Sequence, residues 1–203
     1  MPAPIPAGRV VAGTARGTRL IGPGEGVRPL GDRLKEALFA ILEPGIRDAR
    51  ILDLFAGSGA GGIEGLSRGA SHATFVDRDP RAVAAIRRNL EVTRLAGPAA
   101  TVEQAEALEW LARARVGRIP DDAVLIDPPY DRPELLLAVL ERVSAAGSPP
   151  SRGAVLAERG TLVAKHAART ELPAEIGLLR SVRERRFGDS ALTLYRWSTE
   201  EAG

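Results

Sequence analysis

Apolar residues along the chain follow two spacings, which predicts alternating strands and helices. Short, mostly apolar runs of four or five residues, each a candidate buried strand, occur at 50–54, 73–76, 99–102, 123–126 and 154–157. Between these runs, apolar residues recur every three or four positions, which is the period of an amphipathic helix. A further helix, which we expect Asp32 to cap, precedes the first run. The pattern therefore predicts five successive β–α units.

The last part of the chain shows a different pattern. Two longer strand-like segments, 179–187 and 190–197, flank Gly188-Asp189, and a two-residue turn that begins with glycine is typical of a β-hairpin. Right-handed crossovers place successive parallel strands in one sheet with helices on both faces. We therefore expect an α/β fold with a doubly wound, mostly parallel, seven-stranded sheet and an antiparallel C-terminal hairpin.

The first 30 residues differ from the rest. Two short apolar pairs, Val10-Val11 and Leu20-Ile21, are separated by glycine and arginine, which indicates a short hairpin or extended segment. We expect residues 1–30 to form an N-terminal arm and residues 31–203 to form one catalytic domain.

Composition narrows the possible chemistry. The chain of 203 residues has no cysteine, which excludes disulfides, cysteine-ligated zinc, iron–sulfur clusters and a thiol nucleophile. Two histidines, His72 and His166, leave little room for a histidine-rich metal site or a Ser-His-Asp triad, so we expect no metal. No apolar run approaches the roughly 18 residues that a membrane span needs. We expect a cytoplasmic protein, and a monomer.

Charge is distributed unevenly. The net charge is +2, but residues 1–35 contain six basic and two acidic residues. This excess favours a polyanionic partner, although each arginine taken singly is more often a solvated surface residue. The candidate RNA-binding residues are Arg9, Arg16, Arg28 and Arg33. A second, weaker basic patch contains Arg183, Arg185 and Arg186.

Carboxylates follow three of the predicted strands. Asp53, Asp77 and Asp127 each stand at the end of an apolar run. Ligands of doubly wound sheets bind outside the carboxyl ends of the strands. The three aspartates are therefore the starting point for a functional interpretation.

The first aspartate begins a glycine-rich segment with two possible interpretations. Gly57, Gly59 and Gly62 fit the dinucleotide pattern G-x-G-x-x-G, and Asp77 has the spacing of a residue that binds the NAD ribose. However, Asp53 would repel a pyrophosphate and attract an ammonium group. We therefore favour S-adenosylmethionine over NAD. The candidate cofactor contacts here are Asp53, Phe55, Ala56, Gly57, Ser58, Gly59, Asp77 and Arg78.

The second aspartate, Asp77, could bind both ribose hydroxyls or cap the next helix. Asp79 directly precedes Pro80, and this order is typical of a helix N-cap followed by the first helical residue. We therefore assign the cap to Asp79 and the ligand to Asp77.

The third aspartate begins the segment Asp127-Pro128-Pro129-Tyr130. Two prolines stiffen this segment and leave backbone carbonyls without local donors. An acidic side chain and a fixed carbonyl can accept both hydrogens of an exocyclic amine, and Tyr130 offers a ring on which an extruded base can stack. We take all four residues as the candidate catalytic residues.

These motifs resemble a known family. The glycine-rich segment D-L-F-A-G-S-G-A at 53–60, Asp77 and D-P-P-Y at 127–130 are similar to those of class I S-adenosylmethionine-dependent amino-methyltransferases. The segments R-V-V-A-G at 9–13 and R-P-L-G-D-R-L-K-E-A-L-F at 28–39, and the closing hairpin, more closely resemble bacterial 16S ribosomal RNA guanine-N2 methyltransferases of the RsmD type.

The resemblance implies an activity and a partner. It implies methyl transfer from S-adenosylmethionine to the N2 amine of a guanine in 16S rRNA, free or in an assembling small ribosomal subunit, by a methyltransferase domain at 31–203. It also implies that Glu106 lies near the adenine amino group, although Glu106 could equally be a solvated helix residue. Leu30-Gly31 replaces two threonines of the family pattern.

Three alternatives remain. A DNA adenine-N6 or cytosine-N4 methyltransferase uses the same D-P-P-Y chemistry, but we find no target-recognition domain. Asp53 argues against an NAD-dependent oxidoreductase. An intact D-P-P-Y segment argues against a non-catalytic nucleotide-binding module.

Overall fold

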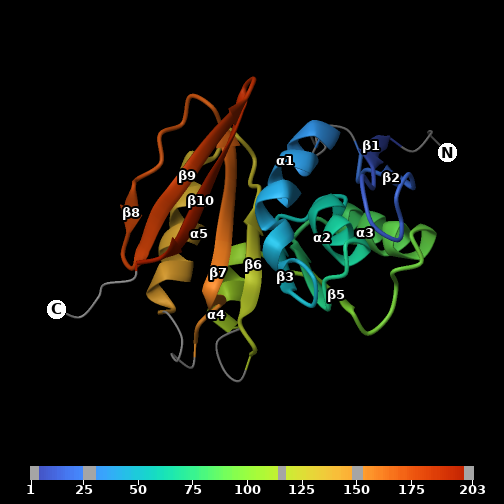
Figure 1. Ribbon diagram of the computed structural model, residues 1–203, viewed down its shortest axis with the longest axis horizontal. Helices are drawn as coiled ribbons and strands as arrows, with labels where there is room; N and C mark the ends of the chain where they lie inside the picture. The colour runs from blue at the N-terminus through green and yellow to red at the C-terminus, as the bar shows by residue number, and fades with distance from the viewer. Residues whose placement is uncertain (1–4, 25–30, 114–117, 148–152, 199–203) are drawn as a thin grey trace. The chain divides into compact units, whose positions relative to one another are not determined.

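The computed structural model describes residues 5–24, 31–113, 118–147 and 153–198 (Figure 1). The chain divides into two compact units, Met1–Ala107 and Leu108–Gly203. The division falls at the start of helix α4 (Ala107–Arg113).

The first unit contains three parallel strands in the order β5-β4-β3. They are β3 (Arg50–Leu54), β4 (His72–Asp77) and β5 (Ala100–Gln104). Thr74 of β4 pairs with Leu52 on one side and with Thr101 on the other. Helices α2 (Ala60–Ser67) and α3 (Pro80–Val92) connect these strands and pack against them, which confirms the predicted β–α units.

Two helices of the first unit begin differently. The Asp79 carboxylate caps α3 by accepting a hydrogen bond from the backbone N–H of Arg81 at 2.8 Å, as predicted. The prediction for α1 (Asp32–Leu42) was wrong, because its N-cap is Gly31 and Asp32 is its first residue. The Asp32 carboxylate instead accepts a hydrogen bond from Arg9 Nε at 3.0 Å.

The N-terminal hairpin, β1 (Pro6–Arg9) and β2 (Arg19–Ile21), is antiparallel and belongs to the first unit. Its connection docks on α2 through Glu64, which is fully buried. The Glu64 carboxylate accepts hydrogen bonds from the backbone N–H groups of Val11 at 2.7 Å and Ala12 at 2.9 Å. Beside them, Gly13 has a φ of +81°, and a Cβ there would lie 1.7 Å from the Ser67 carbonyl oxygen.

The second unit contains five strands in the order β6-β7-β10-β9-β8. They are β6 (Asp121–Ile126), β7 (Leu156–Ala167), β8 (Glu175–Ile176), β9 (Leu179–Phe187) and β10 (Ser190–Trp197). β6 and β7 are parallel, and the remaining pairs are antiparallel. Helix α5 (Pro133–Ala145) packs against β7 and β8. The predicted hairpin over 179–197 is confirmed. Among the described residues, the strands β3 to β10 number eight instead of the predicted seven, and the additional strand is β8.

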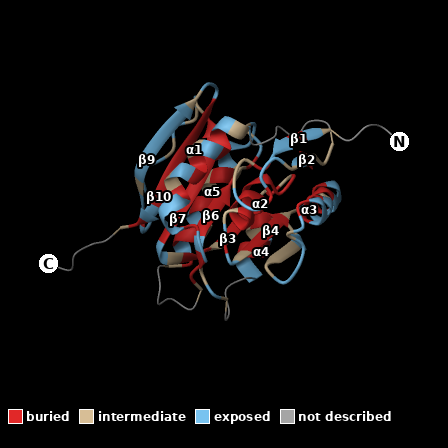
Figure 2. Ribbon diagram, turned by 45° about the vertical axis from the view of Figure 1, so that its right-hand side comes forward, coloured by how far each residue is buried: buried red, intermediate tan, exposed pale blue. Residues whose placement is uncertain are grey.

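Strand β7 is much longer than the predicted strand at 154–157. The β6–β7 register shifts between two pairs, Asp121 with Leu156 and Ala123 with Thr161, so β7 contains extra residues there. The irregular part includes the exposed pair Glu158 and Arg159. These polar residues interrupt the apolar pattern and hide the continuation of the strand. Figure 2 shows that most of β7 and β10 is buried, whereas β9 is largely exposed.

Glu64 gives a direct test of how the hairpin is attached. We expect Glu64→Ala to lower the free energy of unfolding by about 3 kcal/mol, because it leaves Arg68 and two backbone N–H groups without their buried acceptor. Urea unfolding measures this change. The control is Glu91→Ala, which removes an exposed ion pair with Arg88 and should change stability by less than about 0.5 kcal/mol. Equal stabilities of the two variants would contradict the role of Glu64.

Candidate active site

The turn after β3, residues 55–59, carries the first group of candidate residues. Phe55, Gly57 and Gly59 have φ values of 62°, 55° and 76°, all in the left-handed region. This conformation costs a non-glycine residue on the order of 1–3 kcal/mol, and such strain concentrates at functional sites. We call this segment the glycine turn.

Asp53, in strand β3 just before the glycine turn, is 5% exposed. Its Oδ2 accepts a hydrogen bond from the backbone N–H of Gly62, in the first turn of α2, at 2.9 Å. A dinucleotide pyrophosphate would require these helix N-terminal donors. The carboxylate therefore opposes a phosphate at this position, which favours S-adenosylmethionine over NAD.

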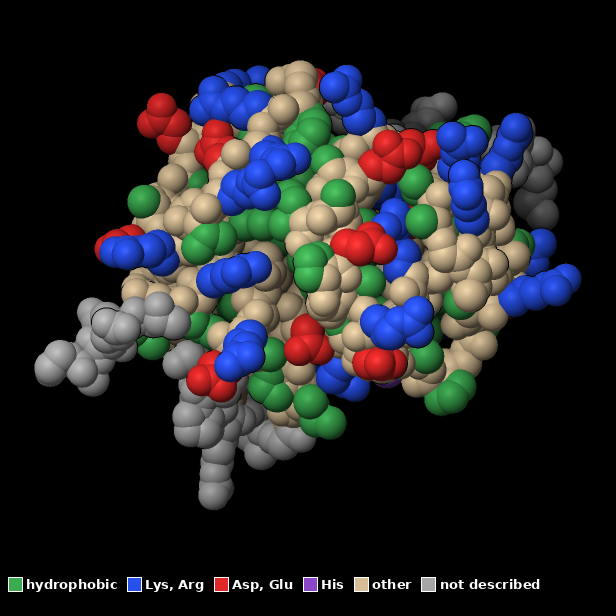
Figure 3. All heavy atoms as spheres, viewed as in Figure 1, with side chains coloured by type: hydrophobic (Ala, Val, Ile, Leu, Met, Phe, Trp, Pro, Cys, Tyr) green, Lys and Arg blue, Asp and Glu red, His purple; other side chains and the backbone are tan. Residues whose placement is uncertain are grey.

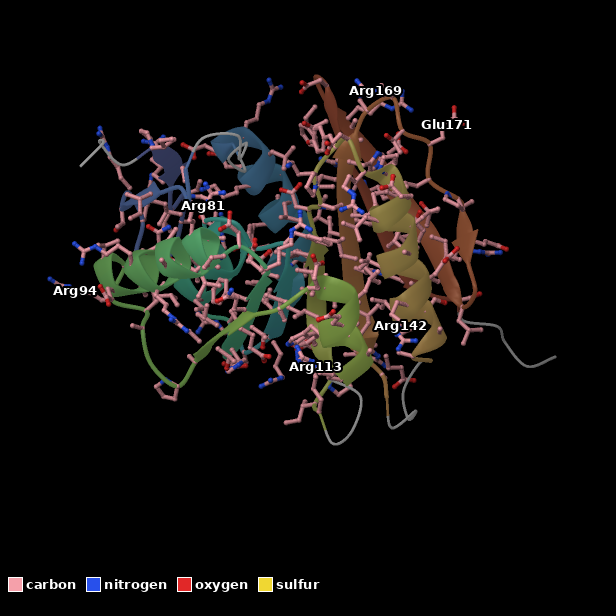
Figure 4. The ribbon with its side chains drawn as sticks, turned by 180° about the vertical axis from the view of Figure 1, so that it is seen from behind. Arg81, Arg94, Arg113, Arg142, Arg169 and Glu171 are labelled. Carbon is pink, nitrogen blue, oxygen red and sulfur yellow. The ribbon has the colours of Figure 1, made fainter. Side chains whose placement is uncertain are left out.

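Asp77, at the end of β4, joins the glycine turn to the next loop. Its Oδ2 accepts from the backbone N–H of Gly57 at 2.8 Å, and its Oδ1 accepts from that of Asp79 at 2.9 Å. Each carboxylate oxygen can accept a further hydrogen bond. The structure thus brings Asp77 to the glycine turn and leaves the helix cap to Asp79. The side chain of Arg81, labelled in Figure 4, also binds Asp79.

Glu106 has a partner that the sequence analysis missed. Its Oε1 accepts a hydrogen bond from Arg78 at 2.9 Å, and the Arg78 pKa is raised by this bond and by the charge of Glu106. The neighbouring backbone N–H of Ala105 donates to the Asp77 carbonyl oxygen at 3.1 Å. The candidate cofactor residues of the first unit therefore share the carboxyl ends of β3, β4 and β5.

In the second unit, the predicted catalytic segment directly follows β6. We call residues 127–130 the D-P-P-Y loop. Pro128 is buried, Pro129 is exposed, and Asp127 and Tyr130 are half-buried. The Tyr130 hydroxyl donates a hydrogen bond to Ser190 Oγ at 2.8 Å, which attaches the loop to the start of β10. A shallow hollow next to the loop is lined by residues that include Pro128, Pro129, Tyr130, Lys165 and Thr170.

Lys165 is a candidate site residue that was not predicted from the sequence. Its Nζ donates to both carboxylate oxygens of Asp127, at 2.6 and 2.7 Å, and lies 4.9 Å from the centre of the Tyr130 ring. Its side chain is 9% exposed. The predicted strand ended at residue 157, well before Lys165. A lysine within the apolar run 161–167, in a chain with only two lysines, was the available signal.

The two partners influence each other's ionisation. Burial raises the pKa of Asp127, and the ammonium of Lys165 opposes this rise. Burial lowers the pKa of Lys165, but the charge and hydrogen bond of Asp127 more than offset this effect, so the Lys165 pKa lies above its usual value. With both oxygens on one ammonium, the carboxyl group of Asp127 is an oriented hydrogen-bond acceptor.

The predicted RNA-binding residues have different surroundings. Arg9 is ion-paired with Asp32, although its side chain is 63% exposed. Arg16 and Arg33 are exposed, and Arg28 lies outside the described residues. Across the ranges that the structure describes, no cluster of acidic or histidine side chains could hold a metal ion. Within the same ranges, no helix is both long enough and apolar enough to cross a bilayer.

A family model described as "Conserved hypothetical protein 95" matches residues 8–196. The chain belongs to this family. It is 34% identical to "Putative rRNA methyltransferase YlbH" of Bacillus subtilis, over 93% of this chain and 98% of that protein. It is 42% identical to "Ribosomal RNA small subunit methyltransferase D" of Escherichia coli, over 61% of each chain.

Solved structures agree with this family membership. "Putative methyltransferase yhhF" of Escherichia coli has a TM-score of 0.80 and 30% identity, and the match covers 98% of this chain and 100% of that one. A hypothetical protein of Thermus thermophilus, TTHA0928, has a TM-score of 0.77 and 31% identity, with 93% and 98% covered. The resemblance to the RsmD type and the class I methyltransferase fold are thereby confirmed.

The charge balance at the D-P-P-Y loop can be tested without substrate. We expect Lys165→Met to raise the Asp127 pKa further, because it removes the charge that opposes the effect of burial. Titration of the aspartate carboxyl carbons by ¹³C NMR measures the shift. Lys165→Arg keeps the charge and is the control. An unchanged Asp127 pKa in Lys165→Met would contradict the assigned pair.

Proposed function

We propose that the protein transfers a methyl group from S-adenosylmethionine to the exocyclic N2 amine of a guanine in 16S rRNA. The observation that carries this proposal is the carboxylate of Asp127, fixed by Lys165 at the head of a D-P-P-Y loop. The names of the Bacillus subtilis and Escherichia coli relatives support rRNA as the substrate. The guanine N2 amine follows from the resemblance described above.

The residues of the first unit fit the cofactor. The Asp77 carboxylate retains lone pairs that can accept both ribose hydroxyls, next to the backbone of the glycine turn. Asp53 brings negative charge to the same end of the sheet, which suits an amino acid's ammonium group and disfavours a pyrophosphate. When bound, S-adenosylmethionine supplies a methyl group that is already activated on a sulfonium.

Residues of the second unit would hold the acceptor. Asp127 and the Pro128 carbonyl accept the two hydrogens of the amine, which directs the nitrogen lone pair away from the base. The ammonium of Lys165 holds both oxygens of Asp127 and favours its charged form, so Asp127 orients the amine. The methylated amine is strongly acidic and loses its extra proton to water. The Tyr130 ring, with Lys165 over one face, offers its opposite face to the base.

The remaining assignments concern the partner. We propose that Arg9, Arg16 and Arg33 contact rRNA phosphates, and Arg28 belongs to the same proposed group although it lies outside the described residues. The substrate is 16S rRNA or a small-subunit assembly particle, which implies action in the cytoplasm. We propose that the protein acts there as a monomer.

A DNA amino-methyltransferase remains the second candidate function, because the D-P-P-Y loop can bind the amine of adenine or cytosine as well. The oxidoreductase alternative requires a pyrophosphate where Asp53 binds the N-terminus of α2. The position of Asp53 therefore disfavours it.

Cofactor binding is tested with a pair of neighbouring aspartates. We expect Asp77→Ala to weaken S-adenosylmethionine binding about ten- to a hundredfold, because it removes charge-assisted hydrogen bonds to the ribose. Isothermal titration calorimetry measures the affinity. Asp79→Ala removes the cap of α3 two residues away and should leave the affinity within about twofold of wild type. Tight NADH binding, or wild-type S-adenosylmethionine binding by Asp77→Ala, would contradict the assignment.

Catalysis is tested at Asp127. We expect Asp127→Ala to abolish transfer of labelled methyl groups to 16S rRNA, while S-adenosylmethionine binding changes by less than about threefold, because Asp127 binds only the acceptor. Asp122→Ala changes an exposed aspartate of the preceding strand, β6, and is the matched control. Comparable methylation by Asp127→Ala and Asp122→Ala would overturn the proposed mechanism.

A further inference from the structure

Strand β9 carries four arginines, and the register of the sheet assigns each of them to a face. Successive side chains of a strand point to opposite faces. Arg183 and Arg185 therefore share one face, and Arg186 lies on the other. Arg180 lies beyond a register shift and pairs with Arg196 of β10, which puts it on the face of Arg183 and Arg185 at the far end of the strand. All four arginines are exposed. Figure 3 shows basic side chains along this side of the second unit.

The register places Arg185 in a row with Lys165. Arg185 of β9 pairs with Leu192 of β10, and Leu192 pairs with Lys165 of β7. Directly paired residues of neighbouring strands lie on the same face of a sheet. Arg183 occupies the same face, because it is two residues from Arg185. Ser190, which binds Tyr130, lies two residues from Leu192 and shares that face as well.

Distance along the sheet follows from strand spacing. Neighbouring strands lie about 4.8 Å apart, so the backbone of Arg185 is about 10 Å from that of Lys165. An arginine side chain extends a further several ångströms. Arg183 and Arg185 are therefore within one or two nucleotides of a base bound at the D-P-P-Y loop.

The four arginines also differ in their partners. Arg180 pairs with Glu175 at 2.7 Å and Arg186 pairs with Glu184 at 2.8 Å. On the face of Lys165, neither Arg183 nor Arg185 forms an ion pair with any residue that the structure describes. Two adjacent cations without acidic partners leave a local positive charge on a rigid strand.

We propose that Arg183 and Arg185 bind the phosphates of the single-stranded rRNA segment that flanks the target base. A planar guanidinium group can donate two parallel hydrogen bonds to the oxygens of one phosphate. The two side chains are about 7 Å apart along the strand, so they can contact successive phosphates. Such contacts position the RNA without reading its sequence. This inference rests on the proposed function, since it assigns a substrate surface to the same site.

The test compares two double variants with the same change in net charge. Arg183→Gln/Arg185→Gln removes the unpaired arginines, and Arg180→Gln/Arg186→Gln removes the two arginines of the same strand that are ion-paired with Glu175 and Glu184. All four positions are exposed, and circular dichroism checks that both variants fold. The probe is unmodified 16S rRNA, used free and in reconstituted small-subunit particles.

For Arg183→Gln/Arg185→Gln, we expect KM for RNA to rise about tenfold with kcat and S-adenosylmethionine affinity unchanged. The slope of log K against log salt should decrease in magnitude by about 1.4, corresponding to two lost contacts with a single strand. Arg180→Gln/Arg186→Gln should match wild type in both measurements. This pattern would support the proposal.

Two results would overturn the proposal: equal effects of both double variants, or a wild-type salt slope in Arg183→Gln/Arg185→Gln. Failure of the proposed function is a separate result, since it appears as absent methyl transfer by the wild-type protein. The salt slope is a binding measurement and decides the role of Arg183 and Arg185 even then.

Discussion

The ion pair between Lys165 and Asp127 fixes the part of the protein on which the proposed chemistry depends. The register of the two parallel strands creates this pair, because Ile126 of β6 is opposite Ala164 of β7 and the next residue on each strand is the charged one. Taking charges out of water is costly, so this partly buried ion pair is weak evidence for stability. Its value here is positional: both oxygens of Asp127 are held by one ammonium, and the same ammonium lies over Tyr130.

The first unit uses backbone donors for a similar purpose. Asp53 and Asp77 each accept backbone N–H groups from segments that follow β3, so the positions of the carboxylates and the shape of the glycine turn depend on each other. Asn89 extends this network, since its amide donates to the carbonyl oxygens of both Ser58 and Ile21. One side chain of α3 therefore connects the N-terminal hairpin to the glycine turn.

Much of this arrangement could be predicted from local sequence. The order Asp79-Pro80 predicts the start of α3, and Gly188-Asp189 predicts the hairpin, because each signal depends on the conformational preference of one or two residues. Contacts between residues distant in the chain could not be predicted in this way. The bonds of Arg78 to Glu106 and of Lys165 to Asp127 arise only when strands pair.

Strand β7 shows why the strand predicted at 154–157 was too short. Its irregular pairing with β6 places polar residues within one continuous strand, so periodicity alone ends the strand too early. Asp32 shows a different cause: its carboxylate binds Arg9 from the hairpin, and this tertiary contact replaces the expected helix cap.

The central claim is that the acceptor held by the D-P-P-Y loop is the N2 amine of a guanine in rRNA. The most direct measurement incubates the protein and labelled S-adenosylmethionine with free 16S rRNA, small-subunit particles and DNA in parallel, and then separates the digested nucleosides. We expect label in N2-methylguanosine from rRNA or the particles, and none from DNA. Label in N6-methyladenine or N4-methylcytosine, or label confined to DNA, would contradict it.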